Sequence, residues 1–327
     1  MRLNLCVAAL LAAFALAGCV TVPAPPRESP PSPLPEELAR YYDYAPVSLQ
    51  ARTFEVRGED GWTVRKMELV PTESRPIRVD WYKPDRPGRL PAVLISPILA
   101  GNDLYIRGFA RFYAARGMHA LILYRPKEVF SSDRDLQDVE THFRESVVQL
   151  RQALDWLEAQ ESVDPEQIGS FAISMGSIVT TLLAAVEPRV KASVLGLPAG
   201  RIAEVIMTSK DKAIRKRRRS YLEKRGWDDR RGLEELEKVL VSEPMRLAPA
   251  IDPKRVLIIS GMFDRVLGLG RSMALWRAMG RPRLILLPTG HYTAALATPY
   301  LKAATYSFLR RRLRRTTSSG RSARTGL

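Results

Sequence analysis

The sequence predicts an α/β protein in which a mostly parallel, eight-stranded sheet is covered by helices on both faces. Short apolar segments alternate along the chain with segments whose apolar residues recur every three or four positions. The short segments lack polar alternation, which is typical of strands buried on both faces. With 327 residues, 46% of them hydrophobic, the chain is long enough for one large domain or two small ones.

The N-terminus resembles the signal of an exported bacterial lipoprotein. A basic start is followed by an apolar run from Leu5 to Leu16, which is too short to span a bilayer. The tetrapeptide Leu16-Ala17-Gly18-Cys19 resembles a lipobox, in which the cysteine is acylated and becomes the new N-terminus. The resemblance implies a signal peptide over residues 1–18 and a lipid on Cys19. Cys6 lies in the part that would be removed, so no thiol would remain for a disulfide.

Residues 19–50 are predicted to form a tether rich in proline, since seven prolines fall between positions 23 and 35. Val20 follows the cysteine in place of the aspartate that retains many lipoproteins at the inner membrane. The resemblance therefore implies a cell-envelope protein, anchored to the outer membrane and facing the periplasm.

The folded domain is expected over residues 51–315 and begins with extended segments. Residues 53–70 form two of them around the turn Glu59-Asp60-Gly61. The further predicted strands are residues 76–82, 91–95, 120–124, 168–173, 190–197, 255–259 and 283–287. The helices predicted between them lie around residues 106–113, 139–157, 178–183 and 273–279.

The alternation stops at about 199–252, where a charged, mostly helical segment is expected to cap the end of the sheet. Residues 316–327 are predicted to be a basic, disordered tail.

The formal net charge of +16 is concentrated in two segments. Residues 210–231 hold 11 basic and 4 acidic residues, and residues 310–327 hold 7 arginines and no acid. Neither segment has the interleaved aromatic residues or the recognition helix of a nucleic-acid-binding protein, so no nucleic-acid partner is expected. Two interpretations stay open: a solvated basic face, or contact with anionic lipid headgroups or lipopolysaccharide.

Ser174 is the candidate nucleophile. It ends the apolar strand Ile168–Ile173 and precedes a helix, with the small residues Ala172 and Gly176 two positions away on either side. Such a sharp strand-to-helix turn exposes the serine Oγ. It also places the N–H of Met175 at a helix N-terminus, where it can stabilise an oxyanion.

A serine nucleophile needs a base and an acid. Of the three histidines, His119 begins a strand and His142 lies within an amphipathic helix, so both are interpreted as structural. His291 directly follows the last apolar strand, at the edge of the sheet where Ser174 is expected. Asp264 follows the preceding strand in the same way and is the candidate acid.

The order Ser174, Asp264, His291, after the fifth, seventh and eighth core strands, resembles the α/β-hydrolase superfamily, and its dienelactone-hydrolase and carboxylesterase-like branches most. The resemblance runs from about Thr53 to Leu313 and implies a catalytic triad of these three residues. Ala172 stands where the family usually has glycine.

The loop Ser96–Gly101 replaces a His-Gly-containing loop of the family. By alignment Leu99 gives the second oxyanion N–H, with Ile98 as the alternative, since Pro97 has no N–H.

The sequence thus predicts a serine hydrolase that cleaves a small-molecule or lipid carboxylic ester through an acyl-enzyme. Acyl transfer to an envelope acceptor and peptide hydrolysis use the same triad and remain alternatives, as does a non-catalytic scaffold. No metal or organic cofactor is expected, because the sequence has no metal-ligand cluster and no glycine-rich phosphate loop.

Overall fold

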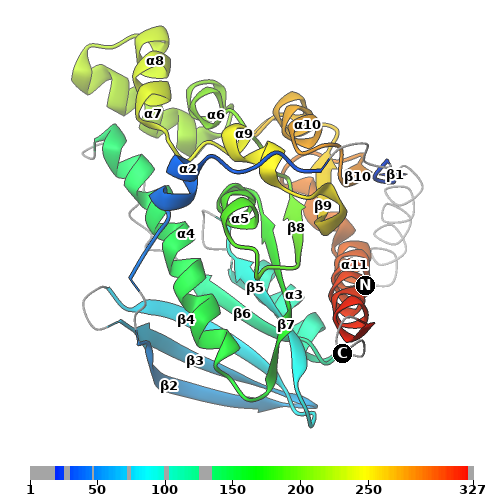
Figure 1. Ribbon diagram of the computed structural model, residues 1–327. Helices are drawn as coiled ribbons and strands as arrows, with labels where there is room; N and C mark the ends of the chain where they lie inside the picture. The colour runs from blue at the N-terminus through cyan, green and yellow to red at the C-terminus, as the bar shows by residue number, and fades with distance from the viewer. Residues whose placement is uncertain are drawn as a thin grey trace, which may run out of the picture.

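The computed structural model describes residues 19–25, 30–45, 48–71, 75–98, 103–124 and 135–322. Its centre is a twisted sheet with the strand order β1-β10-β9-β8-β7-β5-β6-β4-β3-β2 (Figure 1). The six strands from β10 to β6 run parallel, and β1, β4, β3 and β2 are antiparallel to their neighbours. The mixed α/β prediction is confirmed, with ten strands among the described residues instead of eight.

The elements follow the predicted alternation closely. The strands are β1 (Val20–Val22), β2 (Gln50–Glu59), β3 (Trp62–Val70), β4 (Ile77–Pro84), β5 (Leu90–Ser96), β6 (His119–Tyr124), β7 (Val163–Ile173), β8 (Ala192–Gly196), β9 (Val256–Gly261) and β10 (Arg283–Leu287). The α-helices are α2 (Glu36–Tyr41), α3 (Asp103–Ala114), α4 (Leu136–Glu158), α5 (Met175–Val186), α6 (Ile202–Thr208), α7 (Lys212–Arg225), α8 (Asp229–Val239), α9 (Pro244–Leu247), α10 (Leu269–Ala278) and α11 (Thr298–Ser322). The 3₁₀ helices are η1 (Ala248–Ala250), η2 (Pro253–Arg255) and η3 (Thr293–Ala297).

Helices cover both faces of the sheet, because successive side chains of a strand point to opposite sides. In β5, Ala92 and Leu94 pack with α4 and α5, whereas Val93 and Ile95 pack with α3 and α11. Helix α10 packs against β8, β9 and β10 in a smaller cluster. Among the described helices, none combines the length and the apolar character needed to cross a bilayer.

Between β8 and β9 the chain forms α6, α7 and α8, which lie together at one end of the molecule (Figure 1). We call these three helices the cap. They meet at Gly232 of α8, where an added Cβ would lie 2.6 Å from Leu222 and 2.7 Å from Met207. The absence of a side chain at this position lets the three helices pack closely.

The segment predicted as a free tether is partly folded onto the domain, which corrects that prediction. Residues Val20–Val22 pair with β10 as an edge strand. Further along, Leu38 and Tyr42 are buried, and the Tyr42 hydroxyl lies 2.9 Å from Oγ of Ser242. The prolines predict extended chain, but the β-branched residues before them and the aromatic residues after them have apolar surface to bury.

At the other end, α11 continues to Ser322 and so enters the segment 316–327 that was expected to be disordered. A helix that already exists extends at low cost, because each added residue gains one hydrogen bond. The predicted signal peptide, residues 1–18, and the last five residues, 323–327, lie outside the described residues.

Candidate active site

Ser174 lies at the turn between β7 and α5 in a backbone conformation that few residues other than glycine adopt, with φ +57° and ψ −126°. Its N–H donates a hydrogen bond of 2.8 Å to the carbonyl oxygen of Gly196 on the neighbouring strand. The hydroxyl of Ser177, one turn into α5, donates to the same oxygen at 2.6 Å. These contacts fix the strained turn to β8.

The small residues around Ser174 are required by close backbone contacts. A Cβ on Gly176 would lie 2.4 Å from the carbonyl oxygen of Ser96 and 2.9 Å from that of Pro97, so the loop after β5 passes directly over α5. Ala172 is completely buried and pairs with Leu195 of β8, and its carbonyl oxygen would lie 3.2 Å from a Cβ added to Gly196. The missing side chain at Gly196 therefore lets the backbone of β7 pass close to β8 just before Ser174.

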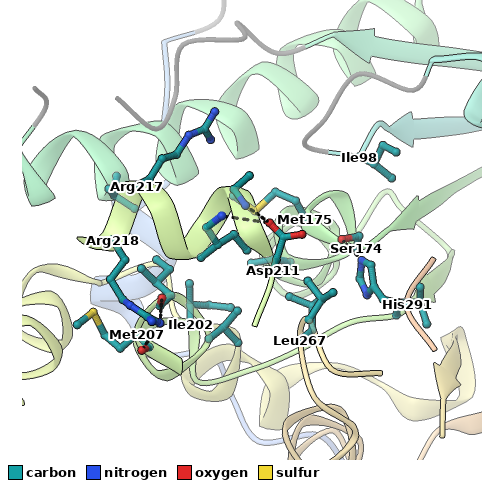
Figure 2. Close-up of a pocket in the computed structure, with 18 of the residues that line it drawn as sticks. Ile98, Ser174, Met175, Ile202, Met207, Asp211, Arg217, Arg218, Leu267 and His291 are labelled. Atoms are coloured by element: carbon teal, nitrogen blue, oxygen red, sulfur yellow. Dashed lines mark hydrogen bonds between the residues drawn. The ribbon is translucent and has the colours of Figure 1, made fainter. Parts of the chain in front are cut away.

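The structure brings Ser174, His291 and Asp264 into one hydrogen-bonded chain. Oγ of Ser174 lies 2.9 Å from Nε2 of His291, and Nδ1 of His291 lies 2.8 Å from Oδ2 of Asp264. Asp264 follows β9 and His291 follows β10, so both loops lie at the edge of the sheet where β7 ends. Figure 2 shows Ser174 and His291 side by side.

The two loops that carry Asp264 and His291 are bonded to each other. The N–H of Phe263 donates to the carbonyl oxygen of Thr289 at 3.0 Å. A Cβ on Gly261 would lie 2.7 Å from that oxygen, so only glycine allows the approach. The separation of the acid and the histidine is therefore set by backbone contacts.

The Asp264 carboxylate is held in its charged form. Burial alone would raise its pKa, but hydrogen bonding and charge interaction with His291, together with the N–H groups of Leu267 and Val266, lower the pKa below its usual value. Oδ1 accepts these N–H groups at 3.1 and 2.8 Å. The side chains of His291 and Asp264 are 9% and 6% exposed, so water scarcely screens the pair.

Met175 is the first residue of α5, and its N–H has no acceptor within the helix. The expected second oxyanion donor, Leu99, lies outside the described residues, and its role stays a prediction. The alternative, Ile98, is described and lines the cavity next to the serine (Figure 2).

The other two histidines have structural partners. His119 is fully buried, with Nε2 2.9 Å from the carbonyl oxygen of Ser162 and its ring stacked on Trp81. Burial lowers its pKa to about 4, so it is neutral near pH 7. His142 is buried in α4 with Nε2 3.4 Å from Oγ of Ser146. Neither side chain lines the cavity beside Ser174.

A cavity of about 440 Å³ extends from Ser174 to the cap. Most of its lining side chains are apolar and come from α4, α5 and the cap; they include Val139, Phe143, Ile178, Ile202, Val205, Met207, Leu222 and Leu236. The apolar residues of α4 recur with the spacing of a helix that faces the core, and nothing in this periodicity distinguishes Val139 and Phe143, which also line the cavity.

Tyr292 and Asp211 form a contact at the cavity that sequence reasoning missed. The Tyr292 hydroxyl donates to Oδ2 of Asp211 at 2.5 Å, while Oδ1 of Asp211 accepts the N–H groups of Ala213 and Ile214 at the start of α7. An aspartate before a helix is a recognisable N-cap, but a partner 81 positions away leaves no local signal.

Among the described residues, no group of three or more His, Cys, Asp and Glu side chains could hold a metal ion. Ser174, His291 and Asp264 are hydrogen-bonded to one another beside the cavity, which Asp211 and Tyr292 also line.

The chain is similar in structure to several solved enzymes. An acetyl xylan esterase from Paenibacillus sp. R4 matches with a TM-score of 0.69 at 17% identity, over 85% of this chain and 92% of that one. A cold-adapted esterase from an Arctic intertidal metagenomic library matches with a TM-score of 0.57 at 19% identity, over 81% and 99%. The acylaminoacyl peptidase of Pyrococcus horikoshii matches with a TM-score of 0.56 at 13% identity, over 81% and 42%. The fold is therefore of the α/β-hydrolase type.

Sequence comparison adds little about function. No protein-family model matches the chain. Two uncharacterised proteins of Mycobacterium tuberculosis, from strains CDC 1551 and H37Rv, are each 23% identical over 169 residues. This match covers 51% of the chain and 38% of the length of those relatives.

Proposed function

We propose that this protein is a serine hydrolase that cleaves a carboxylic ester through an acyl-enzyme. The observation that carries the proposal is the hydrogen-bonded chain from Ser174 through His291 to Asp264 beside an apolar cavity. The esterases among the similar structures favour ester hydrolysis.

In the first half of the reaction, Nε2 of His291 takes the proton of Ser174 as Oγ attacks the ester carbonyl carbon. The carbonyl oxygen becomes an oxyanion, which the N–H of Met175 stabilises. His291 then gives its proton to the leaving alkoxide as the C–O bond breaks. The alcohol leaves, and the acyl group stays on Ser174.

In the second half, His291 takes a proton from water, whose oxygen attacks the acyl carbon. The tetrahedral intermediate collapses, Ser174 regains its proton from His291, and the carboxylic acid is released. Asp264 stays ionised throughout, orients the imidazole through Nδ1 and stabilises its positive form. The low pKa of Asp264 supports this role.

A fluorophosphonate probe tests the proposal directly, because it reacts with an activated serine. We expect wild-type protein to be labelled, Ser174→Ala to be unlabelled, and His291→Ala to be labelled far more slowly. His142→Ala is the matched control and retains labelling, since His142 does not line the cavity. Folded wild-type protein that takes up no label would favour a non-catalytic scaffold instead.

Product analysis separates the alternative reactions of the same triad. Incubation of an ester with water alone or with a candidate amine or alcohol acceptor distinguishes hydrolysis from acyl transfer, and a peptide substrate tests peptidase activity. Free acid as the main product in the presence of acceptor supports hydrolysis.

We also propose export as a lipoprotein with the lipid on Cys19, supported by the tetrapeptide Leu16–Cys19. Incorporation of a labelled fatty acid in a bacterial host that is lost in Cys19→Ala would support this anchoring. Incorporation that persists in the variant would exclude it.

A further inference from the structure

The cavity beside Ser174 is much larger than a small acyl group needs. Its volume of about 440 Å³ lies within the range of roughly 300–1,000 Å³ that is typical of small-molecule sites. An acetyl group on Ser174 would leave most of this volume unfilled.

The walls of the cavity are suited to hydrocarbon. The side chains that reach it from α5, α6 and α8 are apolar, as Ile178, Val205 and Leu236 exemplify. Four charged side chains also border it: Asp135, Asp211, Arg217 and Arg218. Asp211 accepts the Tyr292 hydroxyl and two N–H groups of α7, and the Arg218 guanidinium donates to the backbone oxygen of Met207. In Figure 2, Arg217 and Arg218 lie well apart from Ser174 and His291.

We propose that the ester cleaved at Ser174 carries a medium or long apolar chain, which binds in the cavity between the cap and α4. The inference rests on the proposed ester hydrolysis. Burial of each methylene from water favours binding, so kcat/KM rises with chain length until the cavity is full. The chain belongs to the acyl or to the alcohol side of the ester, and the two sides are tested separately.

Two series of esters test the proposal, with hydrolysis followed by a chromogenic leaving group or by titration of the released acid. One varies the acyl chain from acetate through butyrate and octanoate to dodecanoate, and the other varies the alcohol chain of a fixed acetate. We expect kcat/KM to rise at least about tenfold from the shortest member to octanoate or its alcohol counterpart in one series. A steady fall from the shortest member in both series would overturn the proposal.

A matched pair of variants locates the chain. Val139 lines the cavity from α4, whereas Val148 lies on the same helix outside it. Val139→Phe is expected to lower kcat/KM about tenfold for the long ester and less than about twofold for the shortest one, and Val148→Phe to change neither. Equal losses on short and long esters in Val139→Phe would contradict binding in this cavity.

Failure of this inference and failure of the proposed function are distinguishable. If hydrolysis of short esters depends on Ser174 but kcat/KM shows no preference for chain length, only the proposed binding of an apolar chain is excluded. If the protein is neither labelled by the fluorophosphonate nor active on any ester, the proposed hydrolase activity is itself excluded.

Large apolar side chains are exposed next to the site, and one of them, Tyr292, also lines the cavity. Four large apolar side chains on the loops of Asp264 and His291 are exposed: Met262 at 40%, Phe263 at 64%, Tyr292 at 69% and Leu296 at 63%. We call these four residues the rim. Helix α7 begins beside the rim, because its N-cap Asp211 is bonded to Tyr292.

Helix α7 supplies positive charge next to these apolar residues. Its fourteen residues include eight Lys or Arg and one Glu. Some of these cations are paired, such as Arg219 with Glu223. Four others, Lys212, Arg215, Lys216 and Arg217, are exposed.

Cys19, the first described residue, reaches the same edge of the sheet. Val20 pairs with Leu286 in antiparallel register, which places Cys19 level with Leu287 at the end of β10. The carbonyl oxygen of Leu287 accepts the N–H of Met262, a rim residue, at 2.8 Å. A lipid on Cys19 would therefore enter the bilayer beside the mouth of the site.

We propose that the rim and α7 dock on the surface of a bilayer that contains anionic lipids. Apolar side chains of the rim enter the headgroup region, and the cations of α7 contact the headgroups. The mouth of the cavity then faces the bilayer, from which an ester with an apolar chain can enter.

Flotation of the full-length chain with lipid vesicles tests this docking. One double variant carries Phe263→Ser and Leu296→Ser on the rim. The control double variant carries Phe54→Ser and Val56→Ser, which replace similarly exposed residues on the edge strand β2. With vesicles of phosphatidylcholine and phosphatidylglycerol, the rim variant is expected to bind at least about threefold less, and the control as wild type.

Two results would overturn the docking proposal. One is equal binding of the rim and control variants. The other is wild-type binding to phosphatidylcholine alone that equals binding to the anionic vesicles, or that is insensitive to salt. Hydrolysis of a soluble ester is measured beside flotation in both variants, so that weaker binding is separated from any effect of Phe263, which precedes Asp264, on the chemistry.

Discussion

The hydroxyl of Tyr292 donates a hydrogen bond of 2.5 Å to the carboxylate of Asp211, and so joins the residue after His291 to the residue that caps α7. The same bond, with partial burial and the nearby carboxylate charge, raises the pKa of Tyr292 to about 12. The phenol therefore stays protonated and keeps donating through neutral and moderately alkaline pH. The cap is held to the loop of the histidine by this contact.

Tyr292→Phe tests what the contact does. Loss of one hydrogen bond to a charged acceptor at an exposed position is worth about 1 kcal/mol, so we expect KM for the long-chain ester to rise roughly fivefold with little change in kcat. Tyr306→Phe is the control, since the Tyr306 hydroxyl donates to the backbone oxygen of Arg116 instead. Steady-state kinetics that are the same for both variants would show that the contact does not order the cap.

The strained backbone of Ser174 predicts a gain in stability when the serine is lost. Glycine adopts a φ of +57° without penalty, so Ser174→Gly is expected to raise the free energy of unfolding by about 1 kcal/mol and to abolish hydrolysis. Ser174→Ala is the control, because it loses the same hydroxyl but keeps the Cβ. Urea unfolding measures both, and an equal free energy for the two variants would mean that no strain is released.

Gly176→Ala tests the contact between α5 and the loop after β5. A Cβ there would lie 2.4 Å from the Ser96 oxygen, so the loop must move, at a cost of about 1–3 kcal/mol in stability and a loss of turnover. Gly270→Ala in α10 is the control, since nothing lies within 4 Å of its added Cβ. Thermal unfolding and kcat for both variants give the comparison. Wild-type stability in Gly176→Ala would contradict the close packing.

Asp264 contributes to stability in a pH-dependent way. Its pKa in the folded chain is lowered below the unfolded value of about 4, so its stabilisation is present above that pH and is lost as pH falls through the folded pKa. Asp264→Asn lacks this term, and its free energy of unfolding is expected to fall less between neutral pH and pH 3 than that of wild type. Its kcat is expected to drop about 10⁴-fold. Denaturant titrations at both pH values check the first expectation, and an unchanged pH slope would refute it.

Glu140 links the N-terminal segment to the rest of the domain, and its substitution measures how much this link contributes to the free energy of unfolding. Its carboxyl group is buried and accepts the N–H of Ser242 at 2.9 Å, the hydroxyl of Ser242 at 2.6 Å and that of Tyr41 at 2.8 Å. Glu140→Ala leaves these donors without their acceptor and is expected to cost about 3 kcal/mol, against about 1 kcal/mol for Tyr41→Phe. Denaturant unfolding measures both. Equal small losses would mean that water replaces the carboxyl group.

The sheet and its order of elements could be predicted because strands such as β5 and β9 are apolar on both faces and are separated by helices with clear periodicity. The meeting of Ser174, Asp264 and His291 could also be predicted, since each follows a parallel strand whose end lies at the same edge. Their distances could not, because these depend on backbone approaches such as that of Gly261 to Thr289.

In two parts of the chain, the structure differs from what the amino-acid composition predicts. Residues 19–50 are rich in proline. Nevertheless β1 pairs with the edge of β10 and Tyr42 is buried in the domain, and the local sequence indicates neither contact. The cap was predicted as a charged helical segment. The apolar side chains with which it lines the cavity come from three different helices, so no single stretch of sequence reveals them. Contacts between distant segments decide both outcomes.

The junction at Gly232 gives the cap a means of changing which molecules it accepts. The three cap helices form one continuous insertion between β8 and β9, and they carry neither Ser174, Asp264 nor His291. A substitution near Gly232 that moves α8 relative to Leu222 would reshape the cavity and leave the reacting groups in place. Selectivity and chemistry can thus diverge independently, so related chains could keep the same reaction while adapting to different molecules.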